Sequence, residues 1–413
     1  MQDDILAIDF GTSNSAAAVI ENGRIRRLPI EEGAETLPTA VFFPRQGAMR
    51  IGTAAAEALI AGDEGRYMRA LKSVLGTPLL HELRLIGGER RTVAGIIADF
   101  LTVLKARAEA ATGRRFTRAL SGRPVHFHSN DPARDAQAQA DLRACYLAAG
   151  FAEVDFLPEP EAAALAAHGL GLAGAPGLIV DIGGGTSDFS VFRHEGAGPR
   201  ILASHGIRLG GTDFDEAVSL SHAMPLLGHG TQLRREMGPG LLPVPNAIYA
   251  DLAAWAHIPF VYTPENRRLA VQMARLAVEP ERLERLVTVL TDELGHDLAF
   301  AVERGKIAAN KGGDARIDMG FIQPRLAGPI DGASLQAALR DYRTDLGAAV
   351  ALTLDRAGLA AQDIGDVVLV GGSSLMGLVA EAMRLGVRQE GFRWTTGGGR
   401  RRAWRILAEP AAG

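Results

Sequence analysis

The sequence predicts an α/β protein with two related lobes. Two observations carry this prediction: segments with strand-like and helix-like spacing alternate along the chain, and one strand-turn-strand motif occurs twice. A chain of 413 residues is also too long for a single hydrophobic core, so more than one lobe is expected.

The repeated motif occupies Ile5–Asn14 and Leu178–Asp188. Each copy reads as an apolar strand, an aspartate near its end, a turn of Gly with Thr or Ser, and a second strand. The aspartates, Asp9 and Asp181, lie 172 positions apart. We therefore expect each copy to form a β-hairpin that opens one lobe.

The rest of the chain is assigned from its apolar spacing and its turn residues. Helices are expected at Glu57–Leu75, Val93–Ala111, Asp131–Ala149, from Pro158–Glu161 onward, from Asp213, at Glu279–Asn310 and at Ser334–Leu359. Strands are expected within Ala119–Phe127 and at Val154–Leu157, Arg200–His205 and Val367–Val370. The glycine-rich stretch Gly169–Gly177 predicts a hinge, and residues 225–266 receive no assignment.

The composition excludes several classes of protein. Hydrophobic residues make up 47% and charged residues 22%, and a net charge of -4 is spread along the chain. A general nucleic-acid or membrane binder is therefore not expected. No run of 18 apolar residues and no signal peptide is found, which predicts a cytoplasmic protein. The single cysteine, Cys145, is expected to be a buried apolar residue in a reducing compartment, with a reactive thiol as the alternative.

A phosphate-binding site is the main functional prediction from the residues alone. Glycines in a tight turn allow backbone N–H groups to point at an anion, and Thr or Ser hydroxyls add donors. The expected binding residues are Gly11, Thr12, Ser13 and Asn14 in the first turn and Gly183, Gly184, Gly185 and Thr186 in the second. The alternative is that these are ordinary turn residues.

Acidic residues beside the two turns predict a cation. Asp9, Asp181 and Asp188 lie in or next to the turns. Carboxylates would repel a phosphate unless a cation lies between them. Mg²⁺ held largely through water is the expected ion, with Asp9 and Asp181 as its nearest carboxylates.

These motifs resemble the nucleotide-binding domain of the heat-shock protein 70 (DnaK) family, within the actin, hexokinase and Hsp70 ATPase superfamily. The resemblance runs from about residue 5 to about residue 380. The resemblance rests on six motifs: the phosphate motifs Ile8–Ser15 and Asp181–Asp188, the helix start Glu159–Leu165, the turn Leu209–Asp215, the adenosine motif Val370–Ser374 and the lysine segment Ala70–Gly76. The stretches Met224–Gly230 and Ala277–Arg282 resemble the YegD branch of shortened Hsp70-like proteins.

The resemblance implies a two-lobed actin-like ATPase fold, made of duplicated ribonuclease-H-like domains with an inserted subdomain in each lobe. Lobe I is expected at 1–172 with an insertion at about 37–92, and lobe II at 173–371 with an insertion at about 216–306. Residues 372–413 are expected to return to lobe I and end in an atypical tail.

The same resemblance implies ATP hydrolysis assisted by Mg²⁺, with ATP and ADP as the bound nucleotides. Lys72 would bind the γ-phosphate, Glu159 would orient the attacking water, Thr186 would contact the γ-phosphate, and Asp188 would tune this network. Such roles suit phosphoryl transfer, which needs positioning and charge neutralisation. From the residues alone, Lys72 could equally be a surface lysine and Glu159 a carboxylate at a helix start.

On the nucleoside side, the residues implied are Gly210, Gly211, Glu303, Lys306, Asn310, Gly371, Gly372 and Ser373. Glu303 and Lys306 could also be an exposed pair on a helix. Leu375 stands where the family carries an arginine that stacks on adenine, which predicts weaker adenine binding.

The segment Arg393–Arg405 matches nothing in the family pattern. It is interpreted as a diverged or frame-shifted end, or as a basic binding tail, with a disordered solvated end favoured over a binding role. A chain of this length leaves no room for the family's peptide-binding domain. The function expected is therefore a chaperone-type ATPase module with an unidentified protein partner. The alternatives are a non-catalytic ATP-binding scaffold or filament protein, and a small-molecule kinase.

Overall fold

The computed structural model describes residues 5–167, 175–195, 198–313 and 315–386. The chain divides into two compact units. The first unit comprises Met1–Gly211 and Thr344–Gly413, and the second comprises Thr212–Arg343. Both copies of the repeated motif belong to the first unit.

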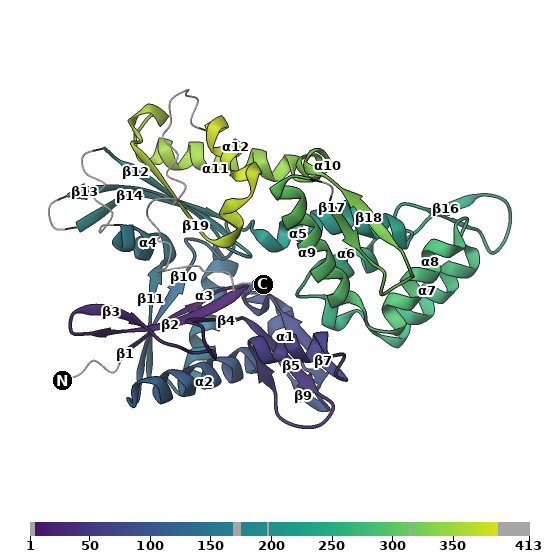
Figure 1. The fold of residues 1–413 in the computed structure, drawn as a ribbon, viewed down its shortest axis with the longest axis horizontal. Coiled ribbons are helices and arrows are strands. Elements are labelled where there is room, and N and C mark those ends of the chain that lie inside the picture. Colours follow the sequence, from purple (N-terminus) through teal and green to yellow (C-terminus); the bar gives the residue numbers. More distant parts are fainter. Residues whose placement is uncertain (1–4, 168–174, 196–197, 314, 387–413) are drawn as a thin grey trace. The chain divides into compact units, whose positions relative to one another are not determined.

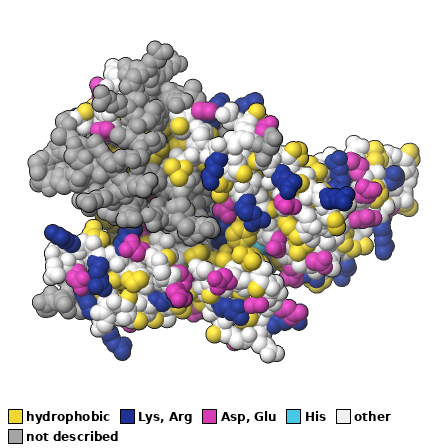
Figure 2. All heavy atoms as spheres, viewed as in Figure 1, with side chains coloured by type: hydrophobic (Ala, Val, Ile, Leu, Met, Phe, Trp, Pro, Cys, Tyr) yellow, Lys and Arg dark blue, Asp and Glu magenta, His cyan; other side chains and the backbone are white. Residues whose placement is uncertain are grey.

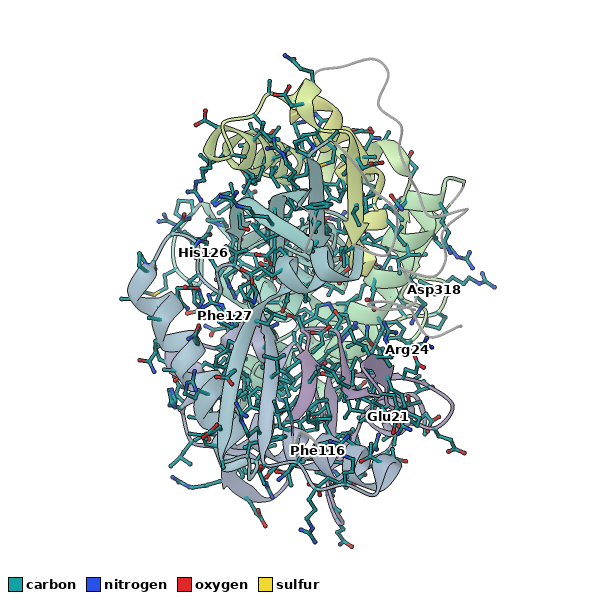
Figure 3. All side chains as sticks on the ribbon, turned by 90° about the vertical axis from the view of Figure 1, so that its left-hand side faces the viewer. Glu21, Arg24, Phe116, His126, Phe127 and Asp318 are labelled. Atoms are coloured by element: carbon teal, nitrogen blue, oxygen red, sulfur yellow. The ribbon has the colours of Figure 1, made fainter. Side chains whose placement is uncertain are left out.

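The largest sheet of the first unit has six strands in the order β11-β10-β1-β2-β3, with β4 pairing to β2 (Figure 1). Its strands are β1 (Ile5–Phe10), β2 (Asn14–Glu21), β3 (Arg24–Arg27), β4 (Thr36–Pro38), β10 (Arg118–Arg123) and β11 (Glu153–Pro158). β1 pairs antiparallel with β2 and parallel with β10. Glu21 and Arg24 are paired at the turn between β2 and β3 (Figure 3).

A second sheet in the same unit repeats this pattern. Its order is β14 (Gly198–Ile207), β13 (Ser187–Glu195), β12 (Gly177–Ile182) and β19 (Asp366–Val370). β12 pairs antiparallel with β13 and parallel with β19, as β1 does with β2 and β10. Asp9 and Asp181 are each the fifth residue of their strand. The predicted pair of matching hairpins is therefore confirmed.

The helices of the first unit follow the predicted order, except that α12 was not predicted. They are α1 (Thr53–Ile60), α2 (Val93–Thr112), α3 (Pro132–Ala148), α4 (Glu159–Ala167) and α12 (Gly377–Gly386), with α5 (Gly211–Val218) and α11 (Arg340–Arg356) at the boundary with the second unit. Side chains of Thr92 and Asp131 cap α2 and α3 by accepting backbone N–H bonds. Cys145 is buried in α3, and burial raises the pKa of its thiol to about 12, which confirms the apolar interpretation.

Helix α4 connects the two sheets. It follows β11 of the first sheet in the chain, and its Ala163 and Ala164 pack against Ile179 and Phe192 of the second sheet. Small alanine side chains allow this close approach of a helix to a sheet. Because α4 begins at Glu159, its first turn directly follows β11 of the first sheet, while its later alanines pack against the second sheet.

Two small sheets lie between β4 and α2, in the region where an insertion was expected. They are β6 (Arg50–Ile51), β5 (Ala40–Pro44) and β7 (Gly65–Arg69), and the pair β8 (Arg84–Ile86) and β9 (Glu89–Arg91). The lobe boundaries themselves, at 172 and 371, remain predictions.

The predicted helix Glu57–Leu75 is wrong beyond Ile60. Gly62 has a φ of 74°, a left-handed conformation that ends α1, and the chain then pairs as β7 with β5. A short 3₁₀ helix, Leu71–Val74, follows.

The second unit contains α6 (Ala247–Ala253), α7 (Pro264–Leu276), α8 (Pro280–Thr291), α9 (Gly295–Lys311) and α10 (Gly332–Ala338), with the strand pairs β15 (Gln232–Arg234) and β16 (Leu241–Pro243), and β17 (Ala315–Asp318) and β18 (Ala327–Ile330). The predicted single helix Glu279–Asn310 is two helices, because Glu293 adopts a φ of 57° between α8 and α9. The predicted helix Ser334–Leu359 is likewise divided, at Leu339 between α10 and α11.

Most of the predicted hinge Gly169–Gly177 and the whole segment Arg393–Arg405 lie outside the described residues. Within the described part of the chain, no helix is long and apolar enough to cross a membrane. On the face displayed in Figure 2, Lys and Arg side chains are interspersed with Asp and Glu.

Candidate functional site

The two predicted glycine turns lie against each other in the first unit. An ideal Cβ atom built on Gly184 would lie 2.6 Å from Ser13 Oγ and 3.0 Å from Thr12 Cβ, and one on Gly185 would lie 3.2 Å from Thr12 Oγ1. A side chain at Gly184 would have to displace Ser13 Oγ and press on Thr12. The structure therefore brings together two segments that are about 170 positions apart in the sequence.

Both turns are tight. In the first, a Cβ atom on Gly11 would clash with the carbonyl oxygen of Asn14. In the second, Gly183 N–H donates to the carbonyl of Thr186 over 3.0 Å. Thr12 is almost completely buried, whereas Asn14 is exposed.

The Gly210–Gly211 segment packs against the second turn. A Cβ atom on Gly210 would lie 2.6 Å from both Gly184 C and Gly185 N. Gly211 N–H donates to the carbonyl of Gly183 over 3.0 Å. These contacts bring the predicted pair of glycines beside the second turn.

The adenosine motif also lies beside this turn. Gly371 has a φ of 82°, and a Cβ atom there would clash with the carbonyl of Ile182 and lie 2.9 Å from Asp181 Oδ1. A Cβ atom on Gly211 would clash with Ser373 Oγ. Gly372 has no such neighbour within 4 Å, and Leu375, two residues after Ser373, is 57% exposed.

Gly210→Ala is expected to weaken the site. The new methyl group meets backbone atoms that cannot rotate away, so the second turn must shift, at a cost of about 1–3 kcal/mol in the free energy of unfolding. Chemical denaturation measures this change. Gly347→Ala in α11 is the matched control, because its methyl group would lie 3.6 Å from its nearest neighbour and alanine favours a helix. Equal stability of both variants would contradict the close packing at Gly210.

Lys72 and Glu159 form an ion pair beside Asp9. Lys72 Nζ lies 2.9 Å from Glu159 Oε1, although the residues are 87 positions apart. The Lys72 side chain is only 7% exposed, so it is not a surface lysine. A Cβ atom on Gly122 would lie 3.5 Å from Glu159 Cγ and 3.8 Å from Asp9 Oδ1, which places Gly122 between these two acids.

Asp188 is anchored by the backbone. Its Oδ1 accepts a bond of 2.7 Å from Val125 N–H, and it is 1% exposed. A Cβ atom on Gly206 would clash with the same oxygen. Gly122, Val125 and Gly206 were not among the predicted site residues. A glycine inside a predicted strand is a signal for close approach, and it could have pointed to Gly122, which lies within Ala119–Phe127; Gly206 falls one residue beyond the predicted strand Arg200–His205.

Burial perturbs the acids of the site. Desolvation, followed by repulsion from Glu159, raises the pKa of Asp9 to about 6 and that of Asp181 to about 8. The pKa of Asp188 is raised for the same reasons, with Asp181 as a further source of repulsion. Burial lowers the pKa of Lys72, but Glu159 and Asp9 outweigh it and raise the pKa above its usual value.

The site therefore has a surplus of negative charge. One lysine faces four acids, Asp9, Glu159, Asp181 and Asp188, and the pKa values of the three aspartates are raised first by burial and then by repulsion between the carboxylates. A divalent cation would relieve this repulsion, so the donor set suits one. Among the described residues, no group of three or more His, Cys, Asp or Glu side chains is arranged to coordinate a metal directly.

The remaining predicted residues, Glu303, Lys306 and Asn310, belong to α9 in the second unit. Lys306 is buried, and its Nζ lies 2.6 Å from Asp215 Oδ1. The Trp255 indole N–H donates to the other oxygen of Asp215 over 3.0 Å. Lys306 is thus held in a buried ion pair inside the second unit and is not an exposed lysine.

The matching hairpins, the facing glycine turns and the surplus of buried acids define a class of protein. It is an α/β protein whose first unit is suited to hold a polyanion together with a cation.

Comparison with known sequences places the chain within a family. The family described as Hsp70 protein matches residues 5–84 and 81–227, more than half of the chain. The chain belongs to the Hsp70 family. The chaperone protein DnaK of Endomicrobium trichonymphae is 33% identical over 222 residues, which cover 52% of this chain and 34% of that protein. The chain thus spans about a third of the length of this curated relative.

Proposed function

We propose that this protein binds Mg·ATP between the two predicted lobes and hydrolyses it, as a chaperone-type ATPase module of the Hsp70 family. The observation that carries the proposal is the contact between the two glycine turns, at Gly184 and Ser13. The ion pair of Lys72 with Glu159 and the acids Asp9 and Asp181 lie in the same unit. Membership of the Hsp70 family supports the choice of nucleotide.

The chain's own residues divide the work of phosphoryl transfer. Backbone N–H groups of Gly11–Ser13 and Gly183–Gly185 bind the phosphate oxygens, with the Thr12 and Thr186 hydroxyls as further donors. Lys72 neutralises charge on the γ-phosphate, and Glu159 orients or polarises the attacking water. Asp188 holds this network in place through its bond to Val125.

Mg²⁺, when bound, would neutralise phosphate charge and relieve the repulsion between the acids. Asp9 and Asp181 would hold its water ligands. The absence of a direct coordination group among the described residues is compatible with such binding through water.

The nucleoside would be held by Gly210, Gly211, Gly371, Gly372 and Ser373, with Glu303, Lys306 and Asn310 as the proposed contacts from α9. Because Lys306 is paired with Asp215, its proposed contribution is a fixed charge rather than a mobile side chain.

We also propose that the chain belongs to the YegD branch, acts in the cytoplasm and works with a protein partner.

Mg·ATP is expected to stabilise the protein against heat. A ligand at 100 times its dissociation constant adds about 2.7 kcal/mol to the free energy of unfolding. Thermal melting with Mg·ATP, Mg·ADP, ATP with EDTA, and no nucleotide measures this shift. We expect Mg·ATP to raise the melting temperature, and ATP with EDTA, which removes Mg²⁺, to raise it less. No shift with any nucleotide would exclude the proposed binding.

Measuring the release of inorganic phosphate from ATP then distinguishes an ATPase from a non-catalytic scaffold and from a kinase. Hydrolysis without an acceptor supports the ATPase. Binding without hydrolysis would make the protein a non-catalytic scaffold, and ATP loss only with added sugars or polyols would make it a kinase.

A further inference from the structure

The segment that carries Lys72 is held by hydrogen bonds to its backbone. It begins at Ala70, whose φ of 58° is unusual for a residue with a side chain, and continues as the 3₁₀ helix Leu71–Val74. Three of its carbonyls accept bonds from distant side chains: Ser73 O from Arg208 over 2.9 Å, Leu75 O from His128 Nε2 over 2.8 Å and Gly76 O from Arg134 over 3.1 Å.

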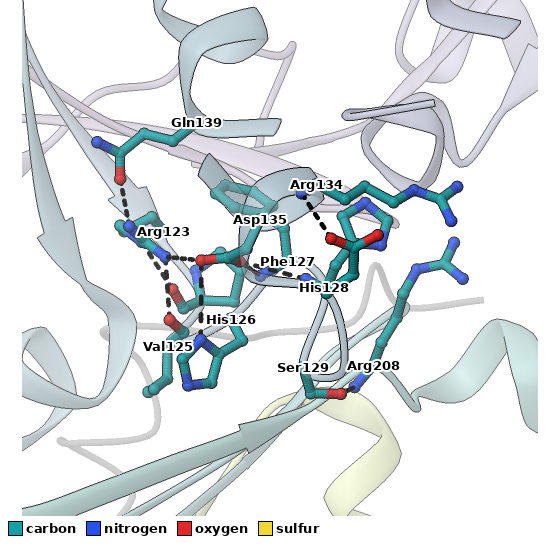
Figure 4. A network of polar contacts seen from close by, with 12 residues as sticks. Arg123, Val125, His126, Phe127, His128, Ser129, Arg134, Asp135, Gln139 and Arg208 are labelled. Carbon is teal, nitrogen blue, oxygen red and sulfur yellow. Dashed lines mark hydrogen bonds and ion pairs between the residues drawn. The ribbon is translucent and has the colours of Figure 1, made fainter. Parts of the chain in front are cut away.

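These three donors come from two different places. His128 and Arg134 lie between β10 and the first turns of α3, so they belong to the same part of the chain as the first sheet. Arg208 instead follows directly after β14 of the second sheet. Its backbone N–H also donates to Ser129 Oγ over 3.4 Å, as Figure 4 shows. Arg208 therefore ties the Lys72 segment to the second sheet.

The residues after Arg208 are tied to the second glycine turn. The hydroxyl of Ser187, directly after that turn, donates to the carbonyl of Leu209 over 2.6 Å and is fully buried. Gly211 N–H donates to the carbonyl of Gly183 over 3.0 Å. The second glycine turn is therefore bonded on both sides to the segment Leu209–Gly211, which directly follows Arg208.

We propose that Arg208 is a positioning residue that couples the second glycine turn to Lys72, an inference that rests on the proposed ATPase function. Its guanidinium holds the carbonyl of Ser73, the residue next to Lys72. The Lys72 ammonium is directed at Glu159 from that same backbone. Binding of a phosphate at the second glycine turn would thereby fix the position of the Lys72 ammonium relative to that phosphate.

Arg208 is a positioning residue and not a catalytic one, because its guanidinium acts on the backbone carbonyl of Ser73, and through it on Lys72. Its loss should leave binding largely intact and slow the chemical step. Arg208→Lys keeps a cationic donor of similar reach, although without the planar guanidinium, so it should restore part of the rate.

The test compares Arg208→Ala, Arg208→Lys and a matched control, Arg356→Ala. Arg356 donates to the carbonyl of Ser204 in β14, the strand that precedes Arg208, over 3.3 Å and lies 3.3 Å from His205 Nδ1, so its contacts are with β14 and not with the Lys72 segment. We expect Arg208→Ala to lower the single-turnover rate about tenfold with little change in KM, since one hydrogen bond to the backbone is lost. Arg208→Lys should recover part of this loss, and Arg356→Ala should match the wild type.

Two further measurements distinguish positioning from general destabilisation. In the Lys72→Ala background, Arg208→Ala should have no additional effect on the rate, because it acts through Lys72. Amide hydrogen exchange at Ser73–Gly76 should slow when Mg·ADP binds the wild type, and this response should be lost in Arg208→Ala.

Each outcome bears on one proposal. If the wild type neither binds nor hydrolyses ATP, the proposed function fails. If it does both, the coupling is overturned by any of three results: an unchanged rate in Arg208→Ala, additivity with Lys72→Ala, or an exchange response that survives Arg208→Ala.

Discussion

Lys72→Ala is expected to lower the single-turnover rate of ATP hydrolysis by about 100-fold or more, while ATP still binds. Preorganised charge at the site of the developing negative charge contributes on this scale. In this protein the Lys72 ammonium is 7% exposed, so water cannot replace it easily, and it lies 2.9 Å from Glu159, the proposed orienting acid. Rapid-quench measurement of phosphate release, with ATP affinity measured separately, tests this expectation.

Lys311→Ala is the control for this prediction, because Lys311 is an exposed lysine in the last turn of α9. Its rate should equal that of the wild type. If Lys72→Ala hydrolyses ATP at the wild-type rate, Lys72 has no part in the chemistry. If ATP affinity falls as far as the rate, Lys72 serves ground-state binding and not the transition state.

Asp215→Ala is expected to lower the free energy of unfolding of the second unit by about 3–5 kcal/mol. The substitution leaves the buried ammonium of Lys306 without its carboxylate and the Trp255 indole N–H without its acceptor. Urea unfolding followed by circular dichroism measures the change.

Two variants accompany this measurement. Asp251→Ala removes a carboxylate that pairs with His257 at a half-exposed position, so it should cost at most about 1 kcal/mol. The double variant Asp215→Ala with Lys306→Met removes both buried charges and should recover most of the loss. A cost below about 1 kcal/mol for Asp215→Ala would show that Lys306 does not depend on this ion pair.

The hairpins could be predicted from the sequence because their signals are local. An apolar run, an aspartate and a glycine turn lie within ten residues at Ile5–Asn14, and nearly the same pattern recurs at Leu178–Asp188. The helices α2 and α3 were also predictable, since apolar spacing and the capping residues Thr92 and Asp131 are read directly from the sequence.

The two overlong helix predictions failed for different physical reasons. Helix α1 ends at a glycine, and the residues after it are recruited as β7 by pairing with β5, which is a tertiary effect. The break between α8 and α9 occurs at Glu293, a residue type that favours helices, in a left-handed conformation that no local pattern announces.

In the site, residues that act through a distinctive side chain could be predicted from the sequence, whereas residues that act through a backbone N–H or bind a backbone carbonyl could not. The turn glycines and the acids stand out by residue type, whereas Lys72 and Glu159 were singled out only by family resemblance, and their ion pair was not predicted. Val125 acts through its N–H group, which every residue except proline carries, so its identity held no signal. Arg208 is one of many arginines, and only its contact with the carbonyl of Ser73 distinguishes it.

The buried thiol of Cys145 makes this chain convenient for spectroscopy. It is the only cysteine of the sequence, and with a pKa of about 12 it stays protonated and slow to react with maleimides at neutral pH. A pair of cysteines introduced on exposed residues, one in each compact unit, would carry dye labels selectively without removing the native residue. Energy transfer between such dyes would then follow, molecule by molecule, how the separation of the units responds to each nucleotide.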